Sequence, residues 1–262
     1  MLFRSPKEHN PLLGMRGIRY LVAHPNLFAV QLRAILRAGV AGKSRILLPM
    51  VSSIEEFETA RELMQEAMAS LRRRRIPFDD EPELGVMIEV PSAVMMADEL
   101  AAIADFFSVG SNDLIQYLLA IDRDDGALSD LYQPHHPAVL RALRRTVEAA
   151  HRFGKPVTIC GEMAGNPLST PLLIGLGFDE LSVSPYMLPD VKQAIRSVRY
   201  TDCRVLAEEA LVCRHPEEVL ALIRHRLGTH FSDVLELILE DESAAAEAAP
   251  RRPARSTKRG AR

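Results

Sequence analysis

The chain has 262 residues, of which 47% are hydrophobic and 26% are charged, a composition typical of a globular protein with one sizeable core. Six basic residues and no acidic ones follow residue 250, which leaves 26 basic and 35 acidic residues and a formal charge of −9 for the rest of the chain. An acidic body argues against a nucleic-acid groove, and no apolar run approaches the ~20 residues needed for insertion into a membrane.

The cysteines are Cys160, Cys203 and Cys213, an odd number, and no signal peptide is visible in the sequence. This pattern favours a reducing, cytoplasmic location over a disulfide framework. No pair of cysteines has the CxxC spacing of a zinc site.

The amino-terminal third predicts a loop followed by a helix, a strand and a second helix. The loop is expected over residues 1–11, because residues 5–11 are polar, and the first helix over residues 26–37, which carry apolar side chains at helical spacing. The apolar run 45–51 predicts a buried strand. Ser53 followed by Glu56 is a capping box, which predicts the start of a helix that continues to about Arg75.

Glu89 ends the apolar stretch that begins at Gly85, and Pro91 after it suits the first turn of a helix, predicted over residues 92–103. A carboxylate at the end of a buried parallel strand lies where α/β sheets place their chemistry. The alternative is an acid favoured at a helix N-terminus by the helix dipole.

Residues 105–117 repeat this layout: an apolar strand, a glycine, polar residues and a helix, with Asp113 just beyond the strand end. Carboxyl ends of neighbouring parallel strands meet at one edge of a sheet. Magnesium accepts one or two carboxylates and fills its other positions with water and substrate oxygens. Glu89 and Asp113 together therefore predict a magnesium site.

The rest of the chain continues the alternation. His135 and His136 are expected to face solvent in a turn-rich connection, before a helix over 137–153 that Gly154 closes. Cys160 ends a predicted strand over 156–162, and a helix (170–176) and a last strand (180–185) follow. Further helices are predicted at 189–197, 202–212, 216–226 and 231–239. Residues 1–240 are thus expected to form one domain, with a disordered basic tail at 241–262.

Five predicted strands, each followed by a helix, indicate an α/β fold with a parallel sheet and right-handed connections. We interpret it as a partial (β/α)8 TIM-type barrel that retains about five of eight strands, with an open sheet as the alternative.

Four segments resemble the phosphoenolpyruvate (PEP)-utilising enzymes: residues 10–19, 85–93, 108–117 and 159–165. The best match is the carboxyl-terminal barrel of enzyme I of the bacterial phosphotransferase system. Within that family, the nitrogen-regulatory paralogue is the more similar in three short segments: His24-Pro, Val109-Gly-Ser and residues 161–165.

The resemblance implies that PEP and Mg²⁺ bind at the barrel mouth. The phosphoryl group then passes to a histidine on a separate domain and onward to a histidine phosphocarrier protein, in a homodimeric enzyme. It implies that Glu89 and Asp113 are the Mg²⁺ ligands, and that Asn112, Asp113, Arg123 and Arg16 form the substrate site. Arginine suits such places because its planar fork binds phosphate or carboxylate oxygens in two-point fashion.

The resemblance also implies that Cys160 protonates the enolate carbon after phosphoryl transfer. A thiol with an ordinary pKa of about 8.5 is mostly protonated at neutral pH and able to donate. Each role has a structural alternative: Cys160 as a buried hydrophobe, Arg123 in a surface ion pair, and Asn112 as a helix cap.

The family's Gly-x-x-Arg-Thr-Glu and Arg-Thr-x-Asp-x-Gly-Gly-Asp-Lys segments do not occur in this sequence, and no histidine lies in a Thr-Ser-His context. We therefore expect a piece of a PEP-protein phosphotransferase that is inactive alone. The alternatives are a fragment of pyruvate phosphate dikinase or PEP synthase, and a non-catalytic dimerisation or partner-binding module.

Overall fold

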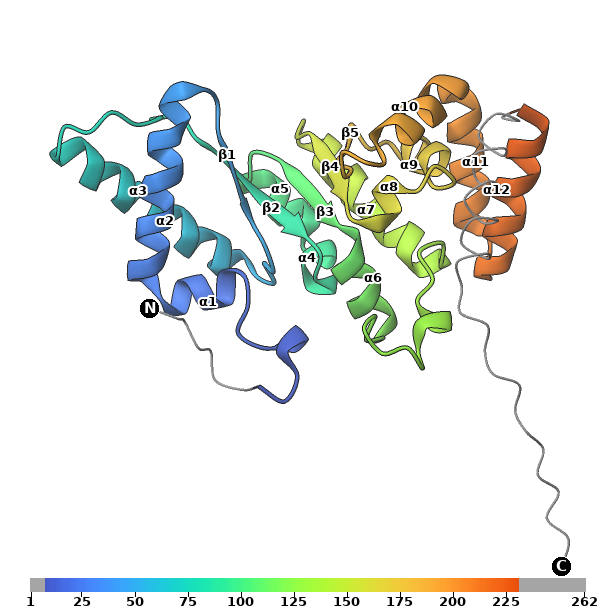
Figure 1. Ribbon diagram of the computed structural model, residues 1–262, viewed down its shortest axis with the longest axis horizontal. Coiled ribbons are helices and arrows are strands. Elements are labelled where there is room, and N and C mark those ends of the chain that lie inside the picture. The colour runs from blue at the N-terminus through green and yellow to red at the C-terminus, as the bar shows by residue number, and fades with distance from the viewer. Residues whose placement is uncertain (1–7, 231–262) are drawn as a thin grey trace, which may run out of the picture.

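A five-stranded parallel sheet forms the centre of residues 8–230, the part of the chain that the computed structural model describes (Figure 1). The strands lie side by side in chain order, and each neighbouring pair is parallel. They are β1 (Arg45–Leu48), β2 (Glu83–Ile88), β3 (Phe107–Gly110), β4 (Val157–Cys160) and β5 (Glu180–Leu181).

Helices connect every strand to the next. The preceding helices are α1 (Ile18–Ala23) and α2 (Pro25–Ala38); the connecting helices are α3 (Ile54–Arg73), α4 (Pro91–Met95), α5 (Ala97–Ile103), α6 (Ser111–Leu119), α7 (Pro137–Arg152), α8 (Glu162–Gly165) and α9 (Thr170–Leu176); those after the sheet are α10 (Leu188–Ser197), α11 (Tyr200–Val212) and α12 (Pro216–His230). Short 3₁₀ turns lie at η1 (Pro11–Leu13), η2 (Gly39–Ala41) and η3 (Ser129–Leu131).

The order of the strands decides the architecture. When strands follow one another in chain order with right-handed crossovers, all crossover helices lie on one face of the sheet, as in a (β/α) barrel. A doubly wound sheet would instead reverse its strand order at a switch point. The predicted α/β fold, a five-stranded section of a TIM-type barrel, is confirmed.

One hydrophobic core fills the space between the sheet and the helices. The central strand β3 is buried along its whole length, as expected for a parallel strand covered on both faces. In Figure 1, α1–α3 lie on the β1 side of the sheet and α10–α12 beyond β5.

The predicted capping box begins α3. The Ser53 hydroxyl accepts the Glu56 N–H at 3.4 Å, and the Glu56 carboxylate accepts the Ser53 N–H at 3.2 Å. The two residues thereby satisfy two of the backbone donors left open at a helix start.

The helix predicted over 92–103 is divided at Met96 into α4 and α5. The Arg145 guanidinium donates to the carbonyl oxygens of Val94 and Met95, each at 3.0 Å, and so satisfies acceptors at the end of α4. The prediction of one helix missed this break because Arg145 lies about 50 residues further along the chain. The last strand is also shorter than predicted and covers only Glu180–Leu181.

The expectation that His135 faces solvent is wrong. Its side chain is buried, and Nε2 lies 3.0 Å from the Ser169 hydroxyl oxygen, within hydrogen-bonding distance. Burial lowers the pKa of His135 to about 4, so the ring is neutral at physiological pH. His136 is half-buried, and its Nδ1 accepts the Ala138 N–H at the start of α7.

The helix predicted at 231–239 and the basic tail at 241–262 lie outside the described residues. Within residues 8–230, no helix combines the length and apolar character that crossing a membrane requires.

Candidate functional site

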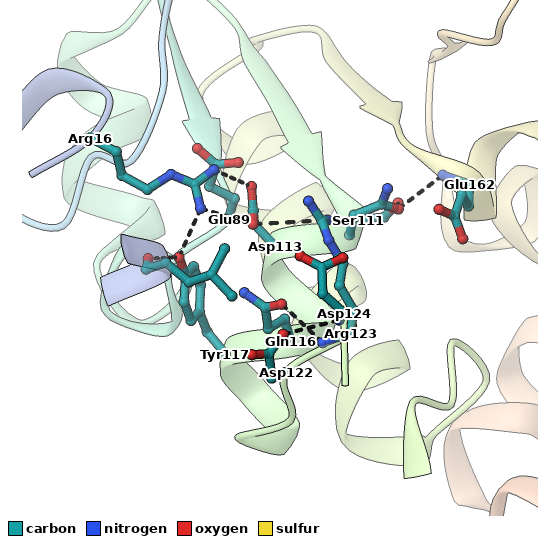
Figure 2. A network of polar contacts seen from close by, with 12 residues as sticks. Arg16, Glu89, Ser111, Asp113, Gln116, Tyr117, Asp122, Arg123, Asp124 and Glu162 are labelled. Carbon is teal, nitrogen blue, oxygen red and sulfur yellow. Dashed lines mark hydrogen bonds and ion pairs between the residues drawn. The ribbon is translucent and has the colours of Figure 1, made fainter. Parts of the chain in front are cut away.

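The carboxyl ends of β2, β3 and β4 meet at one edge of the sheet, and most of the predicted site residues gather there. Ile88 pairs with Val109, and Gly110 pairs with Cys160. Glu89 follows β2 directly, and Asp113 lies in the first turn of α6, directly after β3. Figure 2 shows the Glu89 and Asp113 carboxyl groups next to each other.

Both carboxyl groups are deeply placed, since Glu89 is 3% and Asp113 9% exposed. Burial raises the pKa of Glu89 to about 7, and the neighbouring Asp113 adds to the rise. The Met50 N–H, which donates to Glu89 Oε1 at 2.6 Å, acts in the opposite direction. Two buried acids this close repel each other, and a cation between them would relieve that repulsion.

The backbone around Glu89 is shaped to hold its carboxylate. Met50, just after β1, adopts a left-handed conformation with φ of 61°, which is uncommon for a residue with a side chain. Its N–H thereby points at Glu89. On the other side, a Cβ at Gly110 would lie 2.6 Å from Glu89 Oε2, so only glycine leaves room for this carboxylate position.

Two arginines approach Asp113. Arg16, in the segment between η1 and α1, contacts both carboxylate oxygens, with Nη2 3.0 Å from Oδ2 and Nη1 3.3 Å from Oδ1. Arg123 Nη1 is 3.9 Å from Oδ1. The structure thus brings together four of the predicted site residues, two acids and two arginines.

Tyr117 belongs to the same cluster, and the prediction missed it. Its hydroxyl donates to the Leu12 carbonyl oxygen and accepts from Arg16 Nη1 at 3.2 Å. Figure 2 shows its ring below Arg16. Tyr117 is four residues after Asp113, one helical turn along the same face of α6, and this spacing is the signal that could have found it.

Asn112 contacts the next strand-end segment. Its amide oxygen accepts the Glu162 N–H at 2.9 Å, where α8 begins. Gly161 adopts a φ of 96° there, and a Cβ on it would lie 2.7 Å from the Asn112 amide oxygen. Asn112 therefore acts as a helix cap, here for α8, which is the structural role considered in the sequence analysis. Its predicted contact with a substrate stays a prediction.

Cys160 ends β4 near the two acids. Its thiol is 3.4 Å from the Val109 carbonyl oxygen, to which it donates. Burial raises its pKa, and the charges of Glu89 and Asp113 raise it further, while Ser108 acts to lower it. The thiol is therefore protonated at neutral pH, as a proton donor must be.

The donor set suits a hard divalent cation such as magnesium. Among residues 8–230, no three histidine, cysteine, aspartate or glutamate side chains converge as a metal-binding group. Two carboxylates are too few for a structural zinc site, but magnesium requires no more than one or two and takes water or ligand oxygens for the rest. The pair Glu89 and Asp113 fits magnesium by this measure.

Comparison with known proteins identifies the family. A family profile described as "PEP-utilising enzyme, PEP-binding domain" matches residues 2–200, a range that includes every site residue named above. The PEP-protein phosphotransferase of Staphylococcus carnosus is 45% identical over 218 residues, and that of Listeria monocytogenes is 44% identical over 218 residues. Each alignment covers 83% of this chain and 38% of the relative.

Multiphosphoryl transfer protein 2 of Escherichia coli is 44% identical over 218 residues, with 83% of this chain and 26% of the relative covered. Among solved structures, a citrate lyase from Burkholderia xenovorans LB400 matches with a TM-score of 0.47 and 18% identity, covering 85% of this chain and 70% of the other. The chain spans less than two fifths of the length of these curated relatives. With the family profile and the sequence identity in agreement, the chain belongs to the PEP-utilising enzymes, and its residues 2–200 match their PEP-binding domain.

Proposed function

We propose that this chain is the PEP-binding part of a PEP-protein phosphotransferase. The observation that carries the proposal is the meeting of two buried carboxyl groups and two arginines at the carboxyl ends of β2 and β3. Acids there suit a divalent cation, and guanidinium groups suit the phosphate and carboxylate of PEP. The names of the Staphylococcus carnosus and Listeria monocytogenes relatives support the same reaction.

In this proposal Glu89 and Asp113 hold Mg²⁺, and Arg16, Arg123 and Asn112 bind and orient the substrate. Bound Mg²⁺ would neutralise charge on the phosphoryl oxygens. The protein's own contribution is positioning: Met50 and Gly110 fix Glu89, and α6 carries Asp113.

Cys160 is the proton donor of the second half of the reaction. The P–O bond of PEP breaks, a P–N bond forms on the accepting histidine, and the enolate of pyruvate remains. The Cys160 thiol gives its proton to the methylene carbon, and water restores the proton to the thiolate. A raised pKa keeps the thiol protonated for this step.

The partners follow from the same reading. The acceptor is a histidine on a separate domain, and a histidine phosphocarrier protein receives the phosphoryl group afterwards. We further propose that the working enzyme is a homodimer in the cytoplasm. Pyruvate phosphate dikinase, PEP synthase and a non-catalytic module are less favoured, because the Staphylococcus and Listeria relatives reported above are named as PEP-protein phosphotransferases.

A binding experiment on the 262-residue chain tests the proposal. Calorimetric titration with Mn²⁺, as a probe for Mg²⁺, should show weak binding that Asp113→Asn abolishes. The matched control is Glu99→Gln, which removes one acidic charge from an exposed position on α5 and should leave binding within about twofold. Equal binding by the wild type and Asp113→Asn would remove the proposed site.

A further inference from the structure

Arg16 pairs with the Asp113 carboxylate, the same group that a metal ion at this site would need as a ligand. Its guanidinium contacts both oxygens of Asp113, at 3.0 and 3.3 Å, while the Asp113 side chain is only 12% exposed. A two-point contact of this kind is the strongest form of arginine–carboxylate pairing. A cation that binds Asp113 must therefore compete with this guanidinium or share the carboxylate with it.

Tyr117 holds Arg16 in that position. The same Nη1 that contacts Asp113 also donates to the Tyr117 hydroxyl, and this hydroxyl donates in turn to the Leu12 carbonyl oxygen. Asp113 and Tyr117 lie one turn apart on α6. One helix thus supplies both partners of the guanidinium group, and the contact to Leu12 fixes the direction of the hydroxyl.

The charges in the cluster favour exchange. Arg16 is always cationic, and it is the arginine in direct two-point contact with Asp113, whereas Arg123 approaches one oxygen from 3.9 Å. A divalent ion that enters beside Arg16 meets a like charge at short range, which is unfavourable. A phosphate group attracts the guanidinium instead, and so offers Arg16 another partner.

We propose that Arg16 is a built-in counter-ion of Asp113 that competes with the metal, and that Tyr117 is the positioning residue that keeps it there. Binding of a phosphate-bearing anion transfers the guanidinium from Asp113 to the anion and frees the carboxylate for the metal. This inference takes its two ligands, a divalent cation and a phosphate-bearing anion, from the proposed function. It goes further because Arg16 is expected to weaken binding of the cation and to strengthen binding of the anion, and because Tyr117 gains a role.

The test measures Mn²⁺ alone and inorganic phosphate alone, each by calorimetric titration of the full chain. Arg16→Gln should bind Mn²⁺ about tenfold more tightly than the wild type and phosphate about tenfold more weakly. Tyr117→Phe keeps the arginine but loosens it, so Mn²⁺ binding should tighten about threefold. Arg33→Gln, on α2 and outside the site, removes the same charge and should change both affinities by less than about twofold.

The outcomes separate this inference from the proposed function. If Asp113→Asn abolishes Mn²⁺ binding while neither Arg16→Gln nor Tyr117→Phe tightens it, the counter-ion role is overturned and the metal site stands. If Arg16→Gln binds Mn²⁺ when the wild type does not, the competition is supported directly. Absence of Mn²⁺ binding in every variant would overturn both proposals. Thermal unfolding of each variant confirms that the titrated protein is folded.

Discussion

The strand-end site and the interface between α9 and α11 are held together by different forces. At the site, hydrogen bonds and ion pairs join segments far apart in the sequence; Arg16 and Asp113, for example, are 97 residues apart. In the interface, the helix backbones themselves come close, with Gly175 of α9 against the carbonyl group of Cys203 of α11. Polar pairs at the site have alternative partners in water and ligands, whereas an interface packed backbone against backbone has little room to adjust.

This difference predicts where substitutions act. Changes at the site should alter binding more than folding, since Arg16 and Arg123 keep about a third of their side chains exposed. Changes in the interface should alter folding, and binding only when the protein unfolds.

Gly175→Ala should have the largest effect on stability. A Cβ at this position would overlap the carbonyl oxygen of Cys203, which belongs to the backbone of α11 and cannot rotate away. Overpacking costs about 1–3 kcal/mol of the free energy of unfolding, and an overlap with backbone atoms places Gly175→Ala at the upper end, at about 3 kcal/mol. Urea unfolding measures it, with Gly42→Ala as the control, because a Cβ there meets nothing within 4 Å. A loss below 1 kcal/mol would mean that α11 moves freely and that the interface is not rigid.

His135, whose ring lies within hydrogen-bonding distance of Ser169 at the start of α9, predicts a dependence of stability on pH. Its pKa is about 4 in the folded chain and about 6.5 when unfolded, so the unfolded state takes up the proton first as the pH falls. The stabilisation is complete above pH 6.5 and is lost as the pH falls toward 4. Between pH 7 and pH 5 the wild type should lose about 2 kcal/mol more than His135→Gln.

Urea unfolding of both proteins at the two pH values isolates the histidine, because every other titrating group is common to them. Equal losses in the two proteins would show that His135 is protonated without cost, and hence exposed in solution.

Gly110→Ala should weaken the metal site with a smaller effect on the fold. The added Cβ would lie 2.6 Å from Glu89 Oε2 and 3.0 Å from Glu89 Cβ, so the carboxylate must shift. We expect Mn²⁺ binding about tenfold weaker, which corresponds to about 1.4 kcal/mol. Gly126→Ala is the control, since a Cβ there meets nothing within 4 Å. Unchanged Mn²⁺ binding in Gly110→Ala would show that the position of Glu89 does not matter for the metal.

The sequence predicts what depends on neighbours along the chain. The repeated order of apolar strand, acid and helix predicted that Glu89 and Asp113 lie at the same sheet edge, because parallel strands bring their carboxyl ends together. The capping box at Ser53 was visible because its two residues are three positions apart.

What the sequence did not predict depends on partners that folding alone brings near. Two contacts are of this kind: the one between Ser169 and the buried His135, which is 34 residues away, and the one between Arg145 and the carbonyl oxygens at the end of α4. The Met50 N–H that holds Glu89 is a backbone group, and no side-chain pattern marks it. The pairing of Arg16 with Asp113 is equally invisible, since each residue by itself suggests only a ligand contact.

Ser53→Ala is expected to have the smallest effect. It sharpens the comparison because Ser53 makes polar contacts, as the site residues do, but with a residue only three positions away in the sequence. The hydroxyl accepts the Glu56 N–H within one turn of α3, so its removal leaves one backbone donor without that partner. Loss of such a cap costs about 1 kcal/mol of the free energy of unfolding.

Ser197→Ala is the matched control, because the Ser197 hydroxyl only donates back to the Gln193 carbonyl oxygen on the exposed face of α10 and should contribute less than about 0.5 kcal/mol. Urea unfolding gives both values, and Mn²⁺ titration of Ser53→Ala should match the wild type. A weakened Mn²⁺ affinity in Ser53→Ala would contradict the separation of binding from folding. It would mean that loss of the cap at the start of α3 shifts Met50, and with it the Glu89 carboxylate.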